Sequence, residues 1–370
     1  MKIKSSTRPI TLAAVLLTGG ICAPAADKTT PLPKDLPPYG ESKPLEPKDI
    51  QKFELANGLE VWIIPERGFP KVAAALAVHG GYSADPKDRP GMADLLAATV
   101  LEGTKTDTAK QVAEAAQSLG GDLTADASAD GIVISTAILA EGFPKAVQLL
   151  ADISENATFS PAEVKLAASN LQSGIQAQEA LPAFLARRAL YKAVFGDHPY
   201  ATIAPTRESL AATTDTDLKR EYARRFRPDQ SLFVVVGDVD AVRAKTAIEA
   251  AFDSWKAPAT PPVPATPAPE PSRNTAVVYV PRPGSVQTSL YLGTFLPNPA
   301  SSDYHAAVLA NAVYGGTFGS RLVSNIREDK GYTYSPGARV TNFEKVGFWL
   351  PVPTCATKSL VPPSTRFVTS

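Results

Sequence analysis

Residues 49–256 show two kinds of hydrophobic spacing, one typical of strands and one typical of helices. The segment 53–64 (FELANGLEVWII) predicts a β-hairpin, because Asn57-Gly58 is a favoured turn between two apolar runs. Residues 131–139 and 232–236 are rich in β-branched residues and predict strands. Apolar residues spaced three and four apart predict helices at 91–101, 107–119, 143–153, 161–178 and 182–195. This mixture indicates an α+β fold.

A second series of elements follows residue 272. The spacing of apolar residues predicts strands at 276–280, 286–295 and 332–340, and helices at 302–314 and 318–329. Because this order repeats the opening of the first series, we expect two homologous halves. Residues 351–370 have four prolines, and their apolar residues follow neither the spacing of a strand nor that of a helix. We therefore interpret them as an unpatterned tail. We expect a second half left incomplete by a truncation or a shifted reading frame, with a genuine short form as the alternative.

Proline, with 34 residues in the chain, marks the expected boundaries between segments. Seven prolines among residues 257–271 predict a stiff, extended connection, and six prolines among residues 27–48 predict an extended tail. The expected segments are a Pro-rich tail at 26–48, a first half at 49–256, a Pro-rich linker at 257–272 and a partial second half at 273–350.

The first 25 residues have the pattern of a secretory signal peptide. Lys2, Lys4 and Arg8 precede a mostly apolar stretch at 10–21, and Ala23-Pro24-Ala25 supplies the small residues of a cleavage site. The apolar stretch is shorter than the roughly 20 residues that span a bilayer. We therefore expect export to a bacterial periplasm and no stable membrane span after cleavage.

The composition argues against several classes of function. Lys and Arg together number 37, as do Asp and Glu, so the chain lacks the basic surplus that is typical of nucleic-acid binders. Three histidines and two cysteines exclude a disulfide scaffold and a zinc site built from several of these residues.

Two segments resemble the pitrilysin/insulinase family of zinc metallopeptidases. Residues 80–104 (GGYSADPKDRPGMADLLAATVLEGT) are similar to the segment in which that family carries H-x-x-E-H on a helix. Residues 315–335 (GGTFGSRLVSNIREDKGYTYS) are similar to the signature of its second half. Shorter matches at 53–65, 198–200 and 234–240 extend the resemblance over residues 45–350. The resemblance implies two homologous processing-peptidase-like halves.

The zinc motif is degenerate in this chain. Aligning the flanking residues places Asp94 and Ala98 under the two histidines, and Ala97 under the glutamate that acts as general base. Alanine has no donor atom, so it can neither bind a metal nor accept a proton. The register of the family's third ligand falls around Gly174 and Ile175. We therefore expect no cofactor in this chain.

The second segment keeps the residues that the family uses on substrate. The resemblance implies that Tyr334 donates a hydrogen bond to the oxyanion of the tetrahedral intermediate and that Arg327 orients the scissile carbonyl. Tyr332 does not fit the register. Gly315, Gly316 and Gly319 resemble a shortened glycine-rich loop that contacts substrate in the zinc-free subunit of two-subunit relatives.

The resemblance implies a place in a two-chain metalloendopeptidase. One chain of such an enzyme brings zinc, and the other brings the arginine and tyrosine. The expected partners are a homologous zinc-bearing subunit and an extended peptide. Two alternatives remain open: an inactive structural subunit of core type, and a stand-alone peptidase that uses another site.

Overall fold

The computed structural model describes residues 40, 48–271, 275–352 and 354–356. The expected signal peptide, most of the N-terminal tail and residues 357–370 therefore lie outside the described residues. The described residues from Asp49 onward belong to one compact unit.

A six-stranded sheet organises the first half, with the strand order β1-β2-β6-β3-β5-β4. Its strands are β1 (Gln51–Glu54), β2 (Glu60–Pro65), β3 (Lys71–His79), β4 (Leu123–Ala127), β5 (Gly131–Leu139) and β6 (Ser231–Gly237). Strands β2 and β6 run parallel, and the other neighbouring strands are antiparallel. Every second residue of β3 and β5 is buried, so one face of the sheet is covered.

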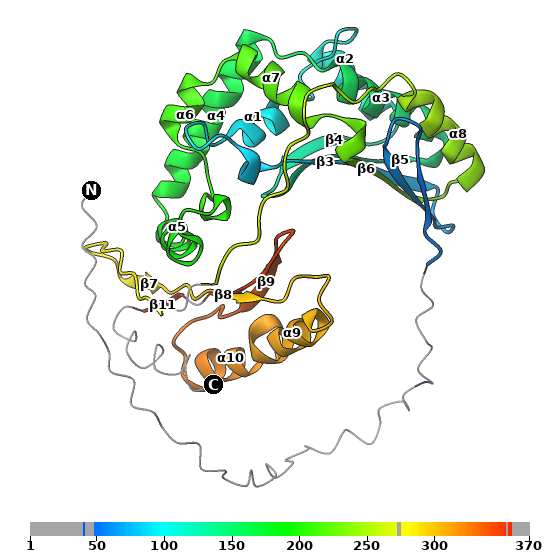
Figure 1. Ribbon diagram of the computed structural model, residues 1–370. Coiled ribbons are helices and arrows are strands. Elements are labelled where there is room, and N and C mark those ends of the chain that lie inside the picture. The colour runs from blue at the N-terminus through cyan, green and yellow to red at the C-terminus, as the bar shows by residue number, and fades with distance from the viewer. Residues whose placement is uncertain (1–39, 41–47, 272–274, 353, 357–370) are drawn as a thin grey trace. The chain divides into compact units, whose positions relative to one another are not determined.

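Helices cover that face (Figure 1). The helices of the first half are α1 (Met92–Thr99), α2 (Ala109–Ser118), α3 (Phe143–Asn156), α4 (Pro161–Glu179), α5 (Pro182–Phe195), α6 (Arg207–Ala212), α7 (Asp215–Arg225) and α8 (Ala241–Phe252). Helix α5 is not part of this layer, because its Tyr191 and Phe195 pack in a separate cluster. Helix α1 packs on β4 and β5, α3 on β5, and α8 on β2. The core lies between these layers, where Leu76, Leu96, Ile134 and Phe233 are fully buried. No helix among the described residues is both long and apolar enough to cross a membrane.

The first half confirms the expected α+β pattern. The hairpin turns at Asn57-Gly58, and the predicted strands and helices correspond to β5, β6, α1, α2, α3, α4 and α5. Strand β4 and helices α6 and α7 were not predicted from the sequence. Helix α7 is dominated by charged residues, and β4 (LTADA) is only partly buried, so neither has a strong apolar period.

The proline-rich segment 257–271 has no regular secondary structure but packs on the first half. Val263, Thr266 and Pro269 are buried, whereas most of the residues between them are exposed. This spacing of three matches the three residues per turn of a polyproline II helix. Thr266 Oγ1 lies 2.7 Å from Ser83 Oγ, and His198 Nε2 lies 2.8 Å from the carbonyl oxygen of Pro267. The linker is thus anchored along one side.

The second half contains a three-stranded antiparallel sheet of order β8-β10-β9 and a separate pair, β7 with β11. Its elements are β7 (Gln287–Ser289), β8 (Thr294–Leu296), α9 (Tyr304–Asn311), α10 (Arg321–Val323), β9 (Ala338–Asn342), β10 (Gly347–Pro351) and β11 (Thr354–Ala356). Helix α9 continues into a π-helical turn, Ala312–Gly316, and α10 into another, Ser324–Asp329.

Three expectations for the second half were wrong. Residues 276–280 form no strand, and Val277 is 94% exposed, because no described strand lies beside them to take up their backbone hydrogen bonds. The strand expected at 286–295 is reduced to β7 and β8. The strand expected at 332–340 begins only at Ala338. In the segment interpreted as an unpatterned tail, Thr354–Ala356 pair with β7 through the backbone.

An aromatic cluster joins the two halves. Phe195 of α5 lies 5.3 Å from Phe348 of β10, and Tyr200 stacks on Phe343 at 4.3 Å between ring centroids. Asp130 adds a polar link, because one carboxylate oxygen accepts a hydrogen bond from the hydroxyl of Tyr200 and the other from the backbone N–H of Glu344. The turn between β9 and β10 is therefore fixed to the first half.

Candidate functional site

Helix α1, which carries the degenerate zinc motif, begins at a glycine with a left-handed backbone. Gly91 has a φ of 104°, a conformation that other residues rarely adopt. The carboxylate of Asp85 accepts hydrogen bonds from the N–H groups of Gly91, at 2.7 Å, and of Ala93, at 3.1 Å. Asp85 therefore caps the first turn of α1, which would otherwise leave these donors unsatisfied.

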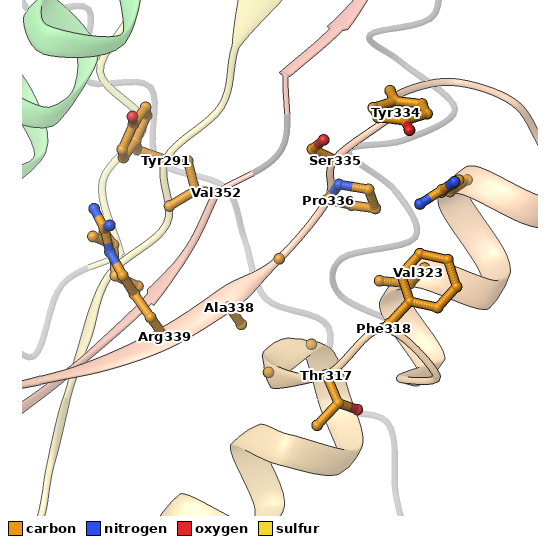
Figure 2. Close-up of a pocket in the computed structure, with 15 residues that line it drawn as sticks. Tyr291, Thr317, Phe318, Val323, Tyr334, Ser335, Pro336, Ala338, Arg339 and Val352 are labelled. Atoms are coloured by element: carbon orange, nitrogen blue, oxygen red, sulfur yellow. The ribbon is translucent and has the colours of Figure 1, made fainter.

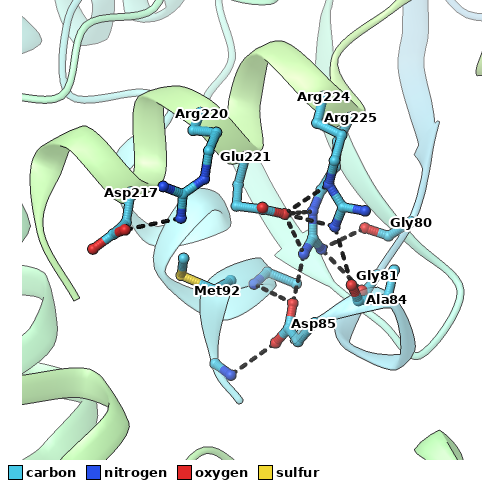
Figure 3. A network of polar contacts seen from close by, with 12 residues as sticks. Gly80, Gly81, Ala84, Asp85, Met92, Asp217, Arg220, Glu221, Arg224 and Arg225 are labelled. Atoms are coloured by element: carbon cyan, nitrogen blue, oxygen red, sulfur yellow. Dashed lines mark hydrogen bonds and ion pairs between the residues drawn. The ribbon is translucent and has the colours of Figure 1, made fainter. Parts of the chain in front are cut away.

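A buried arginine ties this cap to the rest of the half (Figure 3). Arg225 of α7 is 0% exposed, and its guanidinium donates to the carbonyl oxygens of Gly80 and Gly81 and to Asp85 Oδ1. It also donates to Glu221 one turn earlier in α7. Burial raises the pKa of Asp85, while the charge and hydrogen bonds of Arg225 act against that rise. The network thus fixes the end of β3 and the start of α1 together.

Sequence reasoning missed this network, although a signal for it exists. Leu218, Glu221 and Arg225 are spaced by three and four and are all buried, so they occupy one face of α7. Charged residues at positions of the buried face indicate an ion pair inside the protein, because isolated buried charges are strongly disfavoured.

The motif residues lie on α1 as the alignment implied, but they do not form one site. Ala97 is buried and Ala98 is exposed, whereas Asp94 is half-buried and lines a cavity of about 200 Å³. Gly174 and Ile175 of α4 line the same cavity. The structure therefore brings Asp94 next to the two residues that occupy the position expected for the family's third ligand.

The electrostatics around Asp94 are unfavourable for a negative charge. Burial raises its pKa to about 6, and the charge of Asp85 adds to that rise, while Arg225 opposes it. The other polar side chains that line the cavity belong to Tyr82, Asn170, Gln178 and Thr202. These groups do not fit zinc, which takes Cys, His, Asp or Glu ligands. Among the described residues, no three such side chains gather in a set that could hold a metal ion.

The residues of the second family segment, 315–335, lie around a larger cavity of about 520 Å³ in the second half (Figure 2). Arg327, Tyr334, Gly315 and Gly316 line it, whereas Gly319 and Tyr332 do not. A side chain at Gly315 would place its Cβ 2.8 Å from the Cβ of Ala338, so glycine lets this turn approach β9 closely. The structure therefore gathers four of the five residues expected here.

Arg327 is held between two aromatic rings. The centre of its guanidinium lies 4.5 Å from the ring centroid of Tyr334 and 4.7 Å from that of Phe318. Its Nε lies 3.1 Å from Glu328 Oε1. Tyr334 is 79% exposed, so its hydroxyl is accessible to a ligand. The resemblance had not identified Phe318, although an aromatic residue between Gly316 and Gly319 of a glycine-rich turn is a recognisable signal.

The two cavities share no lining residue. Asp94 and Arg327 therefore do not meet in one site of this chain. Among the residues that the structure describes, neither half contains a metal ligand set together with the arginine and tyrosine.

Two sequence models of one peptidase family match the chain. The model described as "Insulinase (Peptidase family M16)" matches residues 63–205, and the one described as "Peptidase M16 inactive domain" matches residues 213–357. The chain belongs to the insulinase family, M16. This confirms the resemblance that residues 80–104 and 315–335 indicated.

Curated insulinase-family relatives are similar over most of the chain. The "Uncharacterized zinc protease YmxG" of Bacillus subtilis is 25% identical over 299 residues, which are 80% of this chain and 72% of that protein. The "Non-peptidase homolog YmxG" of Helicobacter pylori is 26% identical over 276 residues, which are 73% of this chain and 62% of that protein. Relatives described as proteases and as a non-peptidase thus resemble the chain equally.

Solved structures confirm the α+β insulinase-family fold. A peptidase M16 inactive domain from Pseudomonas fluorescens superimposes with a TM-score of 0.79, at 25% identity, over 87% of this chain and 79% of that one. A protease from Helicobacter pylori gives a TM-score of 0.77 at 18% identity, over 83% of this chain and 75% of that one. The periplasmic protease PqqL from Escherichia coli gives 0.63 at 18% identity, over 84% of this chain and 36% of that one.

Proposed function

We propose that this chain is the zinc-free, substrate-binding subunit of a two-chain metalloendopeptidase. It binds extended peptide, and Arg327 and Tyr334 assist the transition state of hydrolysis at a zinc ion held by a homologous partner. The partner would hold the zinc ion, which would supply Lewis-acid activation of water and of the scissile carbonyl. This chain contributes the hydroxyl of Tyr334 as a donor to the oxyanion and the guanidinium of Arg327 as a fixed positive charge.

The contrast between the two motif positions carries this proposal. On α1, the positions of the metal ligands and of the base hold Asp94, Ala97 and Ala98, and the groups around Asp94 do not fit zinc. In the second half, Arg327 and Tyr334 lie against each other at the wall of a cavity of about 520 Å³. An arginine and an exposed tyrosine at one cavity wall can both reach a bound peptide, which supports a role on substrate. The matching "inactive domain" model is compatible with such a subunit.

We propose that the protein works in the periplasm. The signal-peptide pattern of residues 1–25 supports this location.

The decisive experiment compares this chain alone, a homologous chain with H-x-x-E-H from the same genome, and the two mixed. We expect this chain alone to contain no stoichiometric zinc and to cleave no unstructured peptide, and the mixture to cleave faster than the zinc-bearing chain alone. A ratio near one zinc per chain, lost in Asp94→Ala, would contradict the proposal.

An inactive structural subunit of core type remains the second candidate. It predicts that the mixture forms a complex whose cleavage rate equals that of the zinc-bearing chain alone. Size-exclusion chromatography of the mixture, combined with the rate, separates this outcome from a failure to associate.

A further inference from the structure

The cavity beside Arg327 has an unbalanced set of charges. Its ionised lining residues are two arginines, Arg327 and Arg339, and no Asp, Glu or Lys lines it. Tyr291, Tyr334, Ser335 and Thr317 add hydroxyl groups to the wall, and these can donate hydrogen bonds. At about 520 Å³, the cavity is large enough to hold several groups of a ligand.

The two arginines reach the cavity from different elements. Arg339 extends from β9, and Figure 2 shows its side chain directed toward Tyr291, away from Tyr334 and Phe318. Arg327 lies in the turn Ser324–Asp329, between Phe318 and Tyr334. No ion pair or hydrogen bond of the Arg339 side chain occurs within the described part of the chain, and Glu328 Oε1 lies 3.1 Å from Arg327 Nε. The guanidinium of Arg339 is therefore available to a ligand, whereas Arg327 is already paired with Glu328.

The rest of the wall is apolar. Phe318, Val323, Pro336, Leu350 and Val352 line the cavity together with the two arginines. A small inorganic anion would leave this apolar surface in contact with water. A ligand that fits both features presents an anionic group and apolar neighbours, which an extended peptide does.

We propose that this cavity selects peptides by a carboxylate, which Arg339 binds, while Arg327 keeps the role proposed above. The inference rests on the peptide-binding role proposed above and adds the chemical class of the peptide. The carboxylate belongs either to an acidic side chain or to the C-terminus of the peptide, since the two groups have the same charge and geometry. Arginine recognises a carboxylate through paired N–H donors, which gives direction as well as charge.

Fluorescence anisotropy with labelled peptides tests the inference on the full chain. The peptides have one unstructured sequence with Glu, Gln or Lys at the same central position, and each is made with a free and an amidated C-terminus. A hydrogen bond to a charged group contributes about 1.5–3 kcal/mol. We therefore expect the dissociation constant to be about tenfold to a hundredfold lower for a peptide that carries the carboxylate. The preference should shrink as salt is added, because salt screens accessible charges.

Variants assign the preference to Arg339. Arg339→Gln should remove most of the preference for the carboxylate while the Gln peptide still binds. Arg321→Gln is the matched control, since Arg321 is also exposed in the second half but does not line the cavity. Loss of the preference on amidation of the C-terminus assigns the carboxylate to the chain end, and its persistence in the Glu peptide assigns it to the side chain.

Two outcomes overturn the inference in different ways. Equal binding of the Glu, Gln and Lys peptides, with no difference between their free and amidated forms and no change in Arg339→Gln, would refute the charge selection and leave peptide binding intact. No binding of any peptide would refute the peptide-binding role as well.

Discussion

The carboxylate of Asp85 lies 2.7 Å from the guanidinium of Arg225, and both side chains are almost completely buried. This contact connects the C-terminal end of α7 with the first turn of α1, the helix that carries the degenerate motif. The position of Asp94 beside α4 thus depends on an ion pair that lies outside the motif.

We expect Arg225→Ala to destabilise the protein by about 3–5 kcal/mol, because it leaves Asp85 as an unpaired buried charge and removes one of the two arginine partners of Glu221. Urea unfolding measures the loss. The neighbouring Arg224 is the matched control, since its side chain is 31% exposed while it pairs with the same Glu221. Arg224→Ala should cost about 1 kcal/mol or less. Equal losses of unfolding free energy in the two variants would show that the buried network contributes no more to stability than the partly exposed ion pair of Arg224.

Asp94 should make the folded protein more stable at low pH than at neutral pH. Its folded-state pKa, about 6, exceeds the ordinary value of 3.8, so the folded state binds the proton more tightly than the unfolded state. The stabilisation is complete below pH 3.8, falls as the pH rises and is lost above about pH 6. Asp94→Asn should therefore raise the free energy of unfolding at pH 7, by on the order of 1–3 kcal/mol.

The measurement for Asp94 is urea unfolding of both proteins across pH 4–7. The difference between Asp94→Asn and the parent chain should grow with pH and then level off. A difference independent of pH would mean that the carboxylate of Asp94 does not titrate in this window. The conclusion that burial raises its pKa would then be wrong.

Removal of the Phe343 side chain should loosen the second half from the first. Phe343 is buried and stacks on Tyr200. Phe343→Ala should therefore destabilise the contact between the halves by about 3–5 kcal/mol. Hydrogen exchange should become faster in β9 and β10 and stay slow in β3 and β5. Phe69→Ala, at an exposed phenylalanine, is the control and should change neither.

In the mixture with a zinc-bearing partner, Tyr334→Phe should lower the rate of peptide cleavage about a hundredfold to a thousandfold, because one donor to the oxyanion is lost. Arg327→Ala should have a similar effect. Tyr332→Phe is the matched control, since Tyr332 does not line the cavity. An unchanged rate in Tyr334→Phe would show that the arginine and tyrosine have a structural role only.

Local patterns in the sequence predicted much of the first half. The turn at Asn57-Gly58, strand β5 and helices such as α3 and α4 follow from residue spacing, since their backbone hydrogen bonds and apolar faces repeat over short distances. The family motifs also indicated some residues of each cavity, such as Asp94 at one and Arg327 and Tyr334 at the other, but not Phe318.

Tertiary structure decided what residue spacing does not contain. Residues 276–280 have the composition of a strand but form none, because a strand requires a neighbouring strand. The same dependence on distant neighbours buries Arg225 against Gly80 and Gly81, anchors Val263 of the linker, and keeps Asp94 and Arg327 in separate cavities. The residue types were set by the sequence, but their charges, exposure and neighbours were set by contacts between segments far apart in the chain.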